Sequence, residues 1–361
     1  MIFFKDIYRG KKVFITGHTG FKGSWLLKWM EFLGAEVKGY SLAPTTTPNH
    51  LDLLKSQSKS ILANIIDKNR LEKELLDFEP DIVFHLAAQP LVRYSYQAPH
   101  ETFETNVMGT LNMLEACRKS KNIKAIVCVT TDKVYENHES EKCYDESDRL
   151  GGFDPYSSSK ACAELLISSY SNSFFSIDKF GVEHSTLIAS VRGGNVIGGG
   201  DWSEDRLIPD IVKAIVNNQT IEIRNPESVR PWQHVLDCLS GYLLLGQHLI
   251  AGEKEFTGPW NFGPKESIGI KVSEIINIAQ QEWEKLNVNY NSSDLHETKM
   301  LTLNTTKAKN HLKWLPILDD KTMFNWTFQW YKAFYTGTLS TEKQLQLYTE
   351  IAKEQQVTWI Q

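Results

Sequence analysis

Short apolar runs alternate with longer mixed segments along the first half of the chain. The pattern predicts strands at residues 13–16, 36–42, 61–65, 81–86, 125–129 and 185–191, and helices at 24–33, 70–78, 102–119 and from 155 onward. Strands that are apolar along their length and separated by helices are typical of a parallel sheet covered on both faces. With the right-handed crossover rule, this alternation predicts an α/β fold built on a doubly wound parallel sheet.

The pattern changes after about residue 192, where glycines interrupt the chain and the elements become irregular. We expect a smaller α/β domain for the substrate here, interleaved with a return to the sheet around residues 231–263. The predicted division is a Rossmann domain of residues 1–191 plus about 230–263, and a C-terminal substrate domain of about 192–229 plus 264–361. The polar stretch at the C-terminal end, with scattered aromatic residues, predicts no particular element.

With 361 residues, the chain can bury a large core without disulfide or metal support. The net charge of −5 offers no basic surface to nucleic acid, and no apolar run approaches the ~20 residues of a membrane-spanning helix. Five cysteines, an odd number without a CxxC pair, argue against a disulfide framework or a cysteine-rich zinc site. We therefore expect a cytoplasmic protein without a metal.

A glycine-rich turn follows the first predicted strand and opens the first predicted helix. Glycine is needed where a backbone turns tightly or approaches a pyrophosphate, and the helix N-terminus behind the turn attracts phosphate. The predicted dinucleotide-binding turn consists of Gly17, His18, Thr19, Gly20, Phe21, Lys22 and Gly23. The second predicted strand ends without an acidic residue or an arginine, so this position leaves the choice between NAD and NADP open.

Tyr156 and Lys160 are spaced i, i+4 and therefore share one face of the helix that begins near residue 155. A nearby ammonium and nicotinamide lower the pKa of a tyrosine, which then takes a proton from a sugar hydroxyl. Asp154 is placed to cap this helix. The same spacing occurs at Tyr8 and Lys12, but that pair precedes the first strand, and we expect it at the surface.

Thr131, Asp132 and Lys133 lie just past the fifth predicted strand. Ligands bind at the carboxyl ends of strands in open α/β sheets. The segment is therefore either an ordinary polar junction or a second proton-transfer set that faces the same substrate as Tyr156.

Together these residues resemble the extended short-chain dehydrogenase/reductases over essentially the whole chain. The segments that match motifs of that family are residues 17–23, 85–89, 105–110 and 156–160. More narrowly, the chain is similar to the CDP-glucose 4,6-dehydratases. The segments that carry this narrower resemblance are residues 17–25, 89–93, 131–133, 194–202, 206–209 and 230–234.

The resemblance implies an NAD-dependent hydro-lyase that converts CDP-glucose to CDP-4-keto-6-deoxyglucose, a precursor of dideoxy sugars in bacterial surface polysaccharides such as O-antigen. It makes Tyr156, assisted by Lys160, the base at O4 and Asp132 the acid at O6, while Thr131 bonds the O4 region. It also implies a homodimer, or a homotetramer. The implied cofactor contacts beyond the turn are Asn64, Ile65, Leu86, Ala87, Ala88, Gln89, Asn106, Tyr156 and Lys160. The implied substrate contacts are Gln89, Arg93, Asn195, Arg206, Leu207, Arg230 and His296.

Two positions depart from the dehydratase pattern. Asn64 stands where an aspartate usually reaches the adenine, and Lys133 stands where dTDP-glucose relatives carry a glutamate base at C5. A lysine is almost wholly protonated at neutral pH. Lys133 therefore acts as the base only if burial disfavours its ammonium form, and otherwise it stabilises the enolate at C4.

Other functions share parts of this pattern. A 4-epimerase would use the same turn and Tyr156–Lys160 pair but needs no acid for O6, so Asp132 argues against it. A dehydratase for a dTDP-, GDP- or UDP-sugar, an NADP-linked reductase and a dinucleotide-sensing regulator are further alternatives, the last disfavoured by the intact Tyr–Lys pair. Each arginine assigned to substrate could instead form a surface ion pair, above all Arg206, which follows Asp205.

Overall fold

The computed structural model describes residues 2–137, 142–223, 225–265, 269–283, 286–290, 301–338 and 341–360. Its centre is a seven-stranded sheet in the order β12-β7-β5-β4-β1-β2-β3, in which all neighbouring strands are parallel. These strands are β1 (Lys12–Thr16), β2 (Glu36–Ser41), β3 (Lys59–Leu62), β4 (Ile82–His85), β5 (Ala125–Val129), β7 (Leu187–Gly193) and β12 (Gly258–Phe262). The strand order reverses between β1 and β4, which confirms the predicted doubly wound fold.

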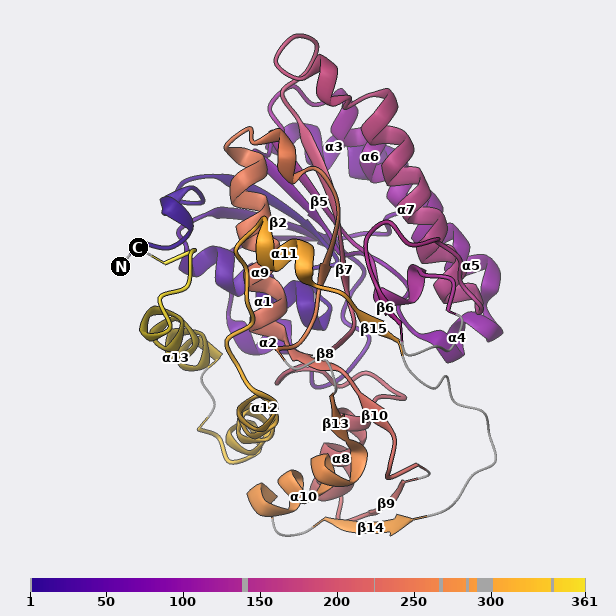
Figure 1. Cartoon of the computed structure of the whole chain (residues 1–361), viewed down its shortest axis with the longest axis vertical. Helices are drawn as coiled ribbons and strands as arrows, with labels where there is room; N and C mark the ends of the chain where they lie inside the picture. The colour runs from indigo at the N-terminus through magenta and orange to yellow at the C-terminus, as the bar shows by residue number, and fades with distance from the viewer. Residues whose placement is uncertain are drawn as a thin grey trace.

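Side chains along each central strand alternate between two hydrophobic cores. In β1, Val13 and Ile15 enter one core while Phe14 enters the other, and Phe84 and Val83 of β4 divide in the same way. The first core lies under α1 (Phe21–Phe32) and α9 (Val235–Ile250), and the second under α3 (Lys68–Phe78), α6 (Gly109–Lys119) and α7 (Pro155–Ser173) (Figure 1). Burial on both faces explains why the interiors of the central strands are mostly apolar.

The helix predicted over residues 102–119 is interrupted. It consists of α5 (Pro99–Phe103), a π-helical turn (Glu104–Met108) and α6. Asn106, inside the π turn, accepts a hydrogen bond from the backbone N–H of Gln89 at 2.8 Å and donates one to Oγ of Ser159 at 2.8 Å. These bonds tie the π turn both to the loop after β4 and to α7, and π turns often occur at functional sites.

A small lobe lies below the sheet in Figure 1. It contains α8 (Leu207–Val216), β9 (Thr220–Ile223), β10 (Val229–Arg230), β13 (Ile270–Lys271), α10 (Val272–Trp283) and β14 (Asn287–Tyr290). Between lobe and sheet, β8 (Asn195–Ile197) pairs with β11 (Trp232–His234), and β6 (Cys143–Tyr144) pairs with β15 (Thr302–Leu303). Strand β12 is the return to the sheet that the sequence predicts, while the domain boundaries themselves stay a prediction.

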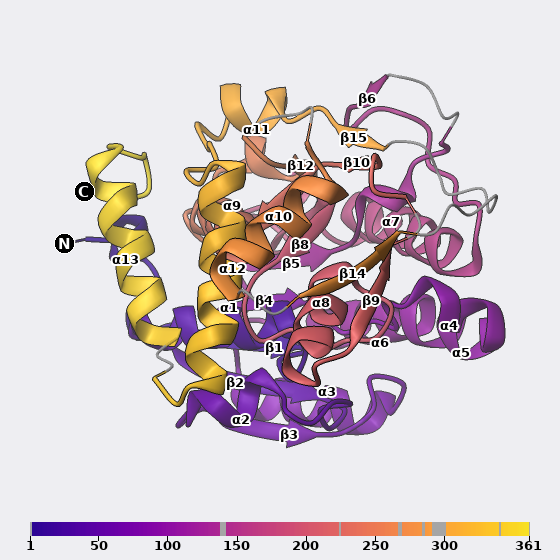
Figure 2. The ribbon, with the colours of Figure 1, turned by 90° about the horizontal axis from the view of Figure 1, so that it is seen from below.

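The remaining helices connect or cover these parts. They are α2 (His50–Leu54), α4 (Val92–Gln97), α11 (Thr306–Asn310), α12 (Asp320–Tyr335) and α13 (Thr341–Glu354), with short 3₁₀ turns at Phe4–Asp6, Asp132–Val134, Ile177–Lys179 and Lys254–Phe256. Helix α13 forms in the C-terminal stretch for which the sequence pattern predicts no element. It lies beside α1, where the rings of Tyr348 and Trp29 meet edge to face at 5.6 Å (Figure 2).

The two ends of the chain meet on the same side of the molecule (Figure 1). Trp359 stacks on Phe4 with ring centroids 5.0 Å apart, and Phe3 forms a β-bridge with Ile360. Within the described residues, no helix combines the length and the apolar character that crossing a membrane requires.

Candidate active site

The three glycines of the N-terminal turn have different physical roles. Gly17 has a positive φ of 77°, and a Cβ there would lie 2.6 Å from the backbone nitrogen of Ala87. A Cβ on Gly23 would lie 2.0 Å from the carbonyl oxygen of Gly17, so both residues must be glycine for the turn to pack. A Cβ on Gly20 would meet only the Gly17 oxygen, at 3.5 Å. The space beside Gly20 is therefore open, and a pyrophosphate can approach the backbone there.

The side chains of the turn divide between the sheet and the open side. His18 is buried, its Nε2 lies 2.6 Å from Oγ of Ser60, and burial lowers its pKa to about 4. A Cβ on Gly39 would lie 2.3 Å from the His18 ring, so the ring packs directly on β2. The Thr19 hydroxyl donates to the carbonyl of Leu42 at 2.9 Å. These contacts hold the turn against the end of β2.

Lys22, the cation within the glycine turn, lies in the first turn of α1. Among the described residues it has no hydrogen-bond or ion-pair partner, although it is half-buried. Burial lowers the pKa of Lys22, and its charge also acts on Lys160 and Asp132. An unpaired, half-buried ammonium at a helix N-terminus fits an anionic ligand such as a phosphate.

The other predicted cofactor contacts lie along the same edge of the sheet. Leu86, Ala87 and Ala88 follow β4 directly and are half-buried. Ile65 is buried against Gly109, where a Cβ would come within 2.6 Å of it. Asn64 is exposed beyond β3, and its Oδ1 accepts a hydrogen bond from the N–H of Ile66 at 3.0 Å. Strand β3 ends at Leu62, earlier than predicted, which leaves Asn64 in the following loop.

Gln89 shapes the loop after β4. Its Nε2 donates to the Leu91 carbonyl at 3.1 Å and to the Thr102 hydroxyl at 2.8 Å, while its Oε1 accepts from the Leu91 N–H at 2.6 Å. Both donor hydrogens and one acceptor position are thus occupied within the chain. The structure therefore gives Gln89 a bracing function, and a substrate contact by its side chain stays a prediction.

Tyr156 and Lys160 lie on α7, and Asp154 caps this helix by accepting from the Ser157 N–H at 2.9 Å. Lys160 is buried and donates to the Val129 carbonyl at the end of β5, at 2.9 Å. Burial, followed by the charge of Lys22, lowers the pKa of Lys160 to about 8. Burial raises the pKa of Tyr156 to about 12, and an interaction with Thr131 opposes this rise. In the chain alone, the phenol pKa thus shifts opposite to the direction expected from the sequence.

Thr131 and Asp132 are buried at the end of β5, facing the same space as Tyr156. The Thr131 hydroxyl donates to Asp132 Oδ1 at 2.9 Å, and burial raises the pKa of the carboxyl. Asp132 Oδ2 would lie 3.2 Å from a Cβ on Gly194, so a side chain at that position would crowd the carboxyl. Lys133, in contrast, is exposed. The protein itself therefore does not provide the burial that would let this lysine act as a base.

The predicted substrate residues lie where the small lobe meets the sheet. Arg93 donates to Asp205 at 2.6 Å across this junction, and Arg206 donates to Asp201 at 3.0 Å rather than to its neighbour Asp205. Asn195 lies on β8, Leu207 begins α8 and Arg230 ends β10. The structure thus brings these residues to one junction, except His296, which lies outside the described residues.

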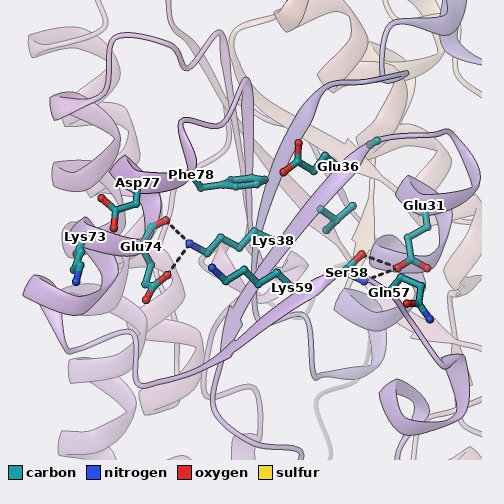
Figure 3. Close-up of a pocket in the computed structure, with 12 residues that line it drawn as sticks. Glu31, Glu36, Lys38, Gln57, Ser58, Lys59, Lys73, Glu74, Asp77 and Phe78 are labelled. Carbon is teal, nitrogen blue, oxygen red and sulfur yellow. Dashed lines mark hydrogen bonds and ion pairs between the residues drawn. The ribbon is translucent and has the colours of Figure 1, made fainter.

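A cavity of ≈ 750 Å³ lies at the opposite edge of the sheet (Figure 3). Its lining includes Glu36 and Lys38 of β2, and Lys59, the first residue of β3. Lys38 is buried and forms an ion pair with Glu74 at 2.6 Å. This cavity is at the amino ends of the strands, away from Tyr156 and the glycine turn, and its buried lysine already has a partner.

The Tyr8–Lys12 pair does not lie at the surface as expected. Tyr8 is only 1% exposed, and its hydroxyl donates to the Leu243 carbonyl of α9 at 2.5 Å. The expectation was wrong because the segment before β1 folds back under α9. Tyr8 is therefore a core residue and contributes to packing.

Two buried residues behind the site were missed from the sequence. Glu164 follows Lys160 by one helical turn and pairs with Arg192 of β7 at 2.9 Å. The available signal was an arginine directly after the strand predicted at residues 185–191, since an arginine that the strand buries almost always has a partner.

A dinucleotide-type glycine turn and a Tyr–Lys helix on one edge of a doubly wound sheet define an extended short-chain dehydrogenase/reductase. The chain belongs to the GDP-mannose 4,6 dehydratase family, whose model matches residues 14–325.

Two relatives and one solved structure are similar to the chain over most of its length. The chain is 44% identical to a CDP-glucose 4,6-dehydratase of Salmonella typhimurium, over 92% of this chain and 94% of the relative. It is 26% identical to a UDP-glucose 4-epimerase of Mycoplasma pneumoniae, over 90% and 97% of the two chains. A solved Thermus thermophilus UDP-glucose 4-epimerase in complex with NAD has the same fold, with a TM-score of 0.76 at 23% identity, covering 89% of this chain and 99% of that one.

The contrast between Gly20 and Gly23 gives a test of the turn. Gly20→Ala should fold with nearly unchanged stability, because its Cβ meets only one atom at 3.5 Å, yet it should weaken NAD binding at least ~10-fold by filling the open side. Gly23→Ala should destabilise the protein without any ligand, because its Cβ would lie 2.0 Å from a backbone oxygen. Thermal unfolding and NAD titration calorimetry measure the two effects. If Gly20→Ala binds NAD as tightly as the wild type, the pyrophosphate does not approach the backbone at Gly20.

Proposed function

We propose that this protein is a hydro-lyase that dehydrates CDP-D-glucose to CDP-4-keto-6-deoxy-D-glucose with bound NAD. The observation that carries the proposal is the 44% identity, over nearly the full length of both chains, to a CDP-glucose 4,6-dehydratase. The buried Asp132, next to the Tyr156–Lys160 pair, supports dehydration as the reaction. The product is a precursor for dideoxy sugars of a bacterial surface polysaccharide.

The residues of the turn fit NAD, since Gly20 leaves an open approach to the helix N-terminus and Lys22 supplies a positive charge that has no ion-pair partner among the described residues. The chemistry that NAD would supply when bound is the acceptance and return of one hydride, together with a positive charge that would favour the phenolate of Tyr156. Tyr156 takes the proton from O4 in the first step. Its pKa of about 12 in the chain alone means that added positive charge is needed to make the phenolate accessible.

The C4 ketone acidifies the proton at C5, and elimination then breaks the C5–H and C6–O bonds. Asp132 donates a proton to the departing O6, and water leaves. Burial raises the pKa of Asp132, which increases the protonated fraction that this donation needs. A 4-epimerase has no leaving group to protonate, so a buried carboxyl here favours dehydration.

Lys133 is assigned as the base at C5, because it occupies the position of the glutamate base in the dTDP-glucose relatives. Its side chain is exposed in the chain alone. The desolvation that favours a neutral amine must therefore come from the bound substrate and cofactor. If Lys133 stays charged, it stabilises the enolate oxygen at C4 and another group takes the proton.

A homodimer in the cytoplasm is part of this proposal. Three large apolar side chains are exposed on the neighbouring helical segments at α5 to α7: Phe103 at 37%, Met108 at 46% and Leu165 at 60%. A second copy of the chain would cover these side chains if the helices pack as a bundle across a two-fold axis. A tetramer is the alternative assembly, and sedimentation separates the two.

A panel of nucleotide sugars tests the function. The protein with added NAD should convert CDP-glucose to a product with the ultraviolet absorbance of a 4-keto sugar in alkali, and should convert dTDP-, UDP- and GDP-linked sugars at least ~10-fold more slowly. Preference for another nucleotide would move the assignment to a different dehydratase. Interconversion of glucose and galactose epimers would identify an epimerase instead.

Tyr156→Phe should keep its fold and lose most of its turnover, because removing a general base lowers kcat by roughly 10²–10⁴-fold. Tyr8→Phe is the matched control. It should retain kcat but lower the free energy of unfolding by about 1 kcal/mol, because it removes a buried hydrogen bond. Steady-state kinetics and urea unfolding measure the two variants. A kcat near the wild-type value in Tyr156→Phe would remove this residue from the mechanism.

Lys133→Met separates the two roles of this lysine. If Lys133 is the base, the variant should still oxidise C4, so bound NADH accumulates, while exchange of the C5 hydrogen with heavy water stops. NADH absorbance and NMR of recovered substrate report the two steps. Exchange at C5 at the normal rate in the variant would assign Lys133 the electrostatic role.

A further inference from the structure

A buried ion pair lies directly behind the reacting residues. Glu164 on α7 accepts hydrogen bonds from Nε and Nη2 of Arg192 at 3.0 and 2.9 Å, so the contact is bidentate. Both side chains are almost completely buried, with exposures of 4% and 3%. Burial alone would raise the pKa of Glu164, but the hydrogen bonds from Arg192 hold it below its usual value. The carboxylate is thus ionised and fixed in orientation.

The same pair reaches the chain on both sides of Thr131–Lys133. Thr130, immediately before this segment, donates its hydroxyl to Glu164 at 2.5 Å. Tyr135, shortly after it, accepts from Nη1 of Arg192 at 2.8 Å, and the guanidinium lies over the Tyr135 ring, 4.9 Å from its centroid. The segment that carries Asp132 is therefore held at both of its ends by one buried ion pair.

The Tyr156 side of the site has further attachments of its own. Lys160 donates to the Val129 carbonyl at 2.9 Å, and Asn106 donates to Ser159, between the two, at 2.8 Å. Asp154 also caps the start of α7. These three contacts do not involve Glu164 or Arg192. Among the described residues, losing the pair leaves the Tyr135 hydroxyl only its hydrogen bond to Asn261, at 2.8 Å, and leaves the Thr130 hydroxyl only a longer one to the Val191 carbonyl, at 3.3 Å. The attachments on the Tyr156 side are unchanged.

We propose that Glu164 and Arg192 are positioning residues for the elimination step. Their ion pair fixes the segment with Thr131, Asp132 and Lys133 in register with the helix that carries Tyr156. The sugar rests against Tyr156 for C4 oxidation, and the acid at O6 must then be correctly placed without any further movement of the sugar. This inference rests on the proposed dehydration, and it adds two residues that do not touch the substrate.

Two variants change the pair with little change in volume. Glu164→Gln keeps the shape of the side chain but removes its charge and one of the two acceptor oxygens that Arg192 uses, and Arg192→Lys keeps the charge without the bidentate fork. In each, product formation should fall by about 10- to 100-fold, because small displacements of a reacting group have effects of that size. C4 oxidation in a single turnover should fall less than ~3-fold, since the Tyr156 attachments remain, so bound NADH should build up. The KM for CDP-glucose should change little.

Lys38→Met is the matched control, because Lys38 is a buried strand lysine that forms an ion pair with the partly buried Glu74, away from the site (Figure 3). It should lose stability but keep the wild-type ratio of elimination to oxidation. If Glu164→Gln and Arg192→Lys slow both steps by the same factor, or leave both unchanged, the positioning role is wrong.

Thr130→Val, which removes only one hydroxyl, repeats the test with a milder change if either variant fails to fold.

Amide hydrogen exchange gives a readout that needs neither substrate nor cofactor. Residues 130–135 should exchange faster in Arg192→Lys than in Lys38→Met, when each variant is measured at the same number of degrees below its own unfolding temperature. Equal exchange in the two variants would contradict the proposal. Wild-type protein without activity on CDP-glucose would overturn the proposed function instead, while the exchange comparison would still decide whether the ion pair holds this segment.

Discussion

Burial of the sheet on both faces is the constraint on which the rest of this structure depends. Successive residues of β1, β4 and β5 enter different cores, so the strand interiors have no place for unpaired polar groups. Polar residues are instead concentrated where the strands end. The glycine turn follows β1, the Gln89 loop follows β4 and Asp132 follows β5, so three loops far apart in sequence meet at one edge. Arg192, a charged residue inside β7, is balanced by Glu164.

Burial also controls the chemistry of the ionisable groups at that edge. It lowers the pKa of Lys22 and Lys160 and raises the pKa of Asp132 and Tyr156, so each of the four is shifted toward its neutral form. A dinucleotide and a nucleotide sugar both bring negative phosphates, and the dinucleotide also brings a positive ring. The shift of Asp132 favours the protonated form that an acid needs, whereas Tyr156 needs the added positive charge of a ligand to reach its phenolate.

Much of the fold could be predicted from the sequence, because the periodicity of hydrophobic residues and the placement of glycines are local signals. The alternation of strands and helices, the doubly wound fold, and the placement of the glycine turn, Tyr156 and Asp132 after particular strands followed from them. The π turn around Asn106, the burial of Tyr8 and the exposure of Lys133 depend on contacts between distant segments, which no local pattern encodes. The hydrogen bonds by which Gln89 braces its loop could not be predicted for the same reason.

The central claim is that one hydride leaves C4 and returns to C6 of the same sugar while water is lost, and an isotope label measures this directly. CDP-glucose deuterated at C4 is converted by the protein in ordinary water with NAD, and the product is examined by NMR and mass spectrometry. The account predicts deuterium at C6 of the 4-keto-6-deoxy product, and hydrogen from solvent at C5. Deuterium retained at C4 of an epimerised sugar, or lost from the product into a pool of free NADH, would contradict it.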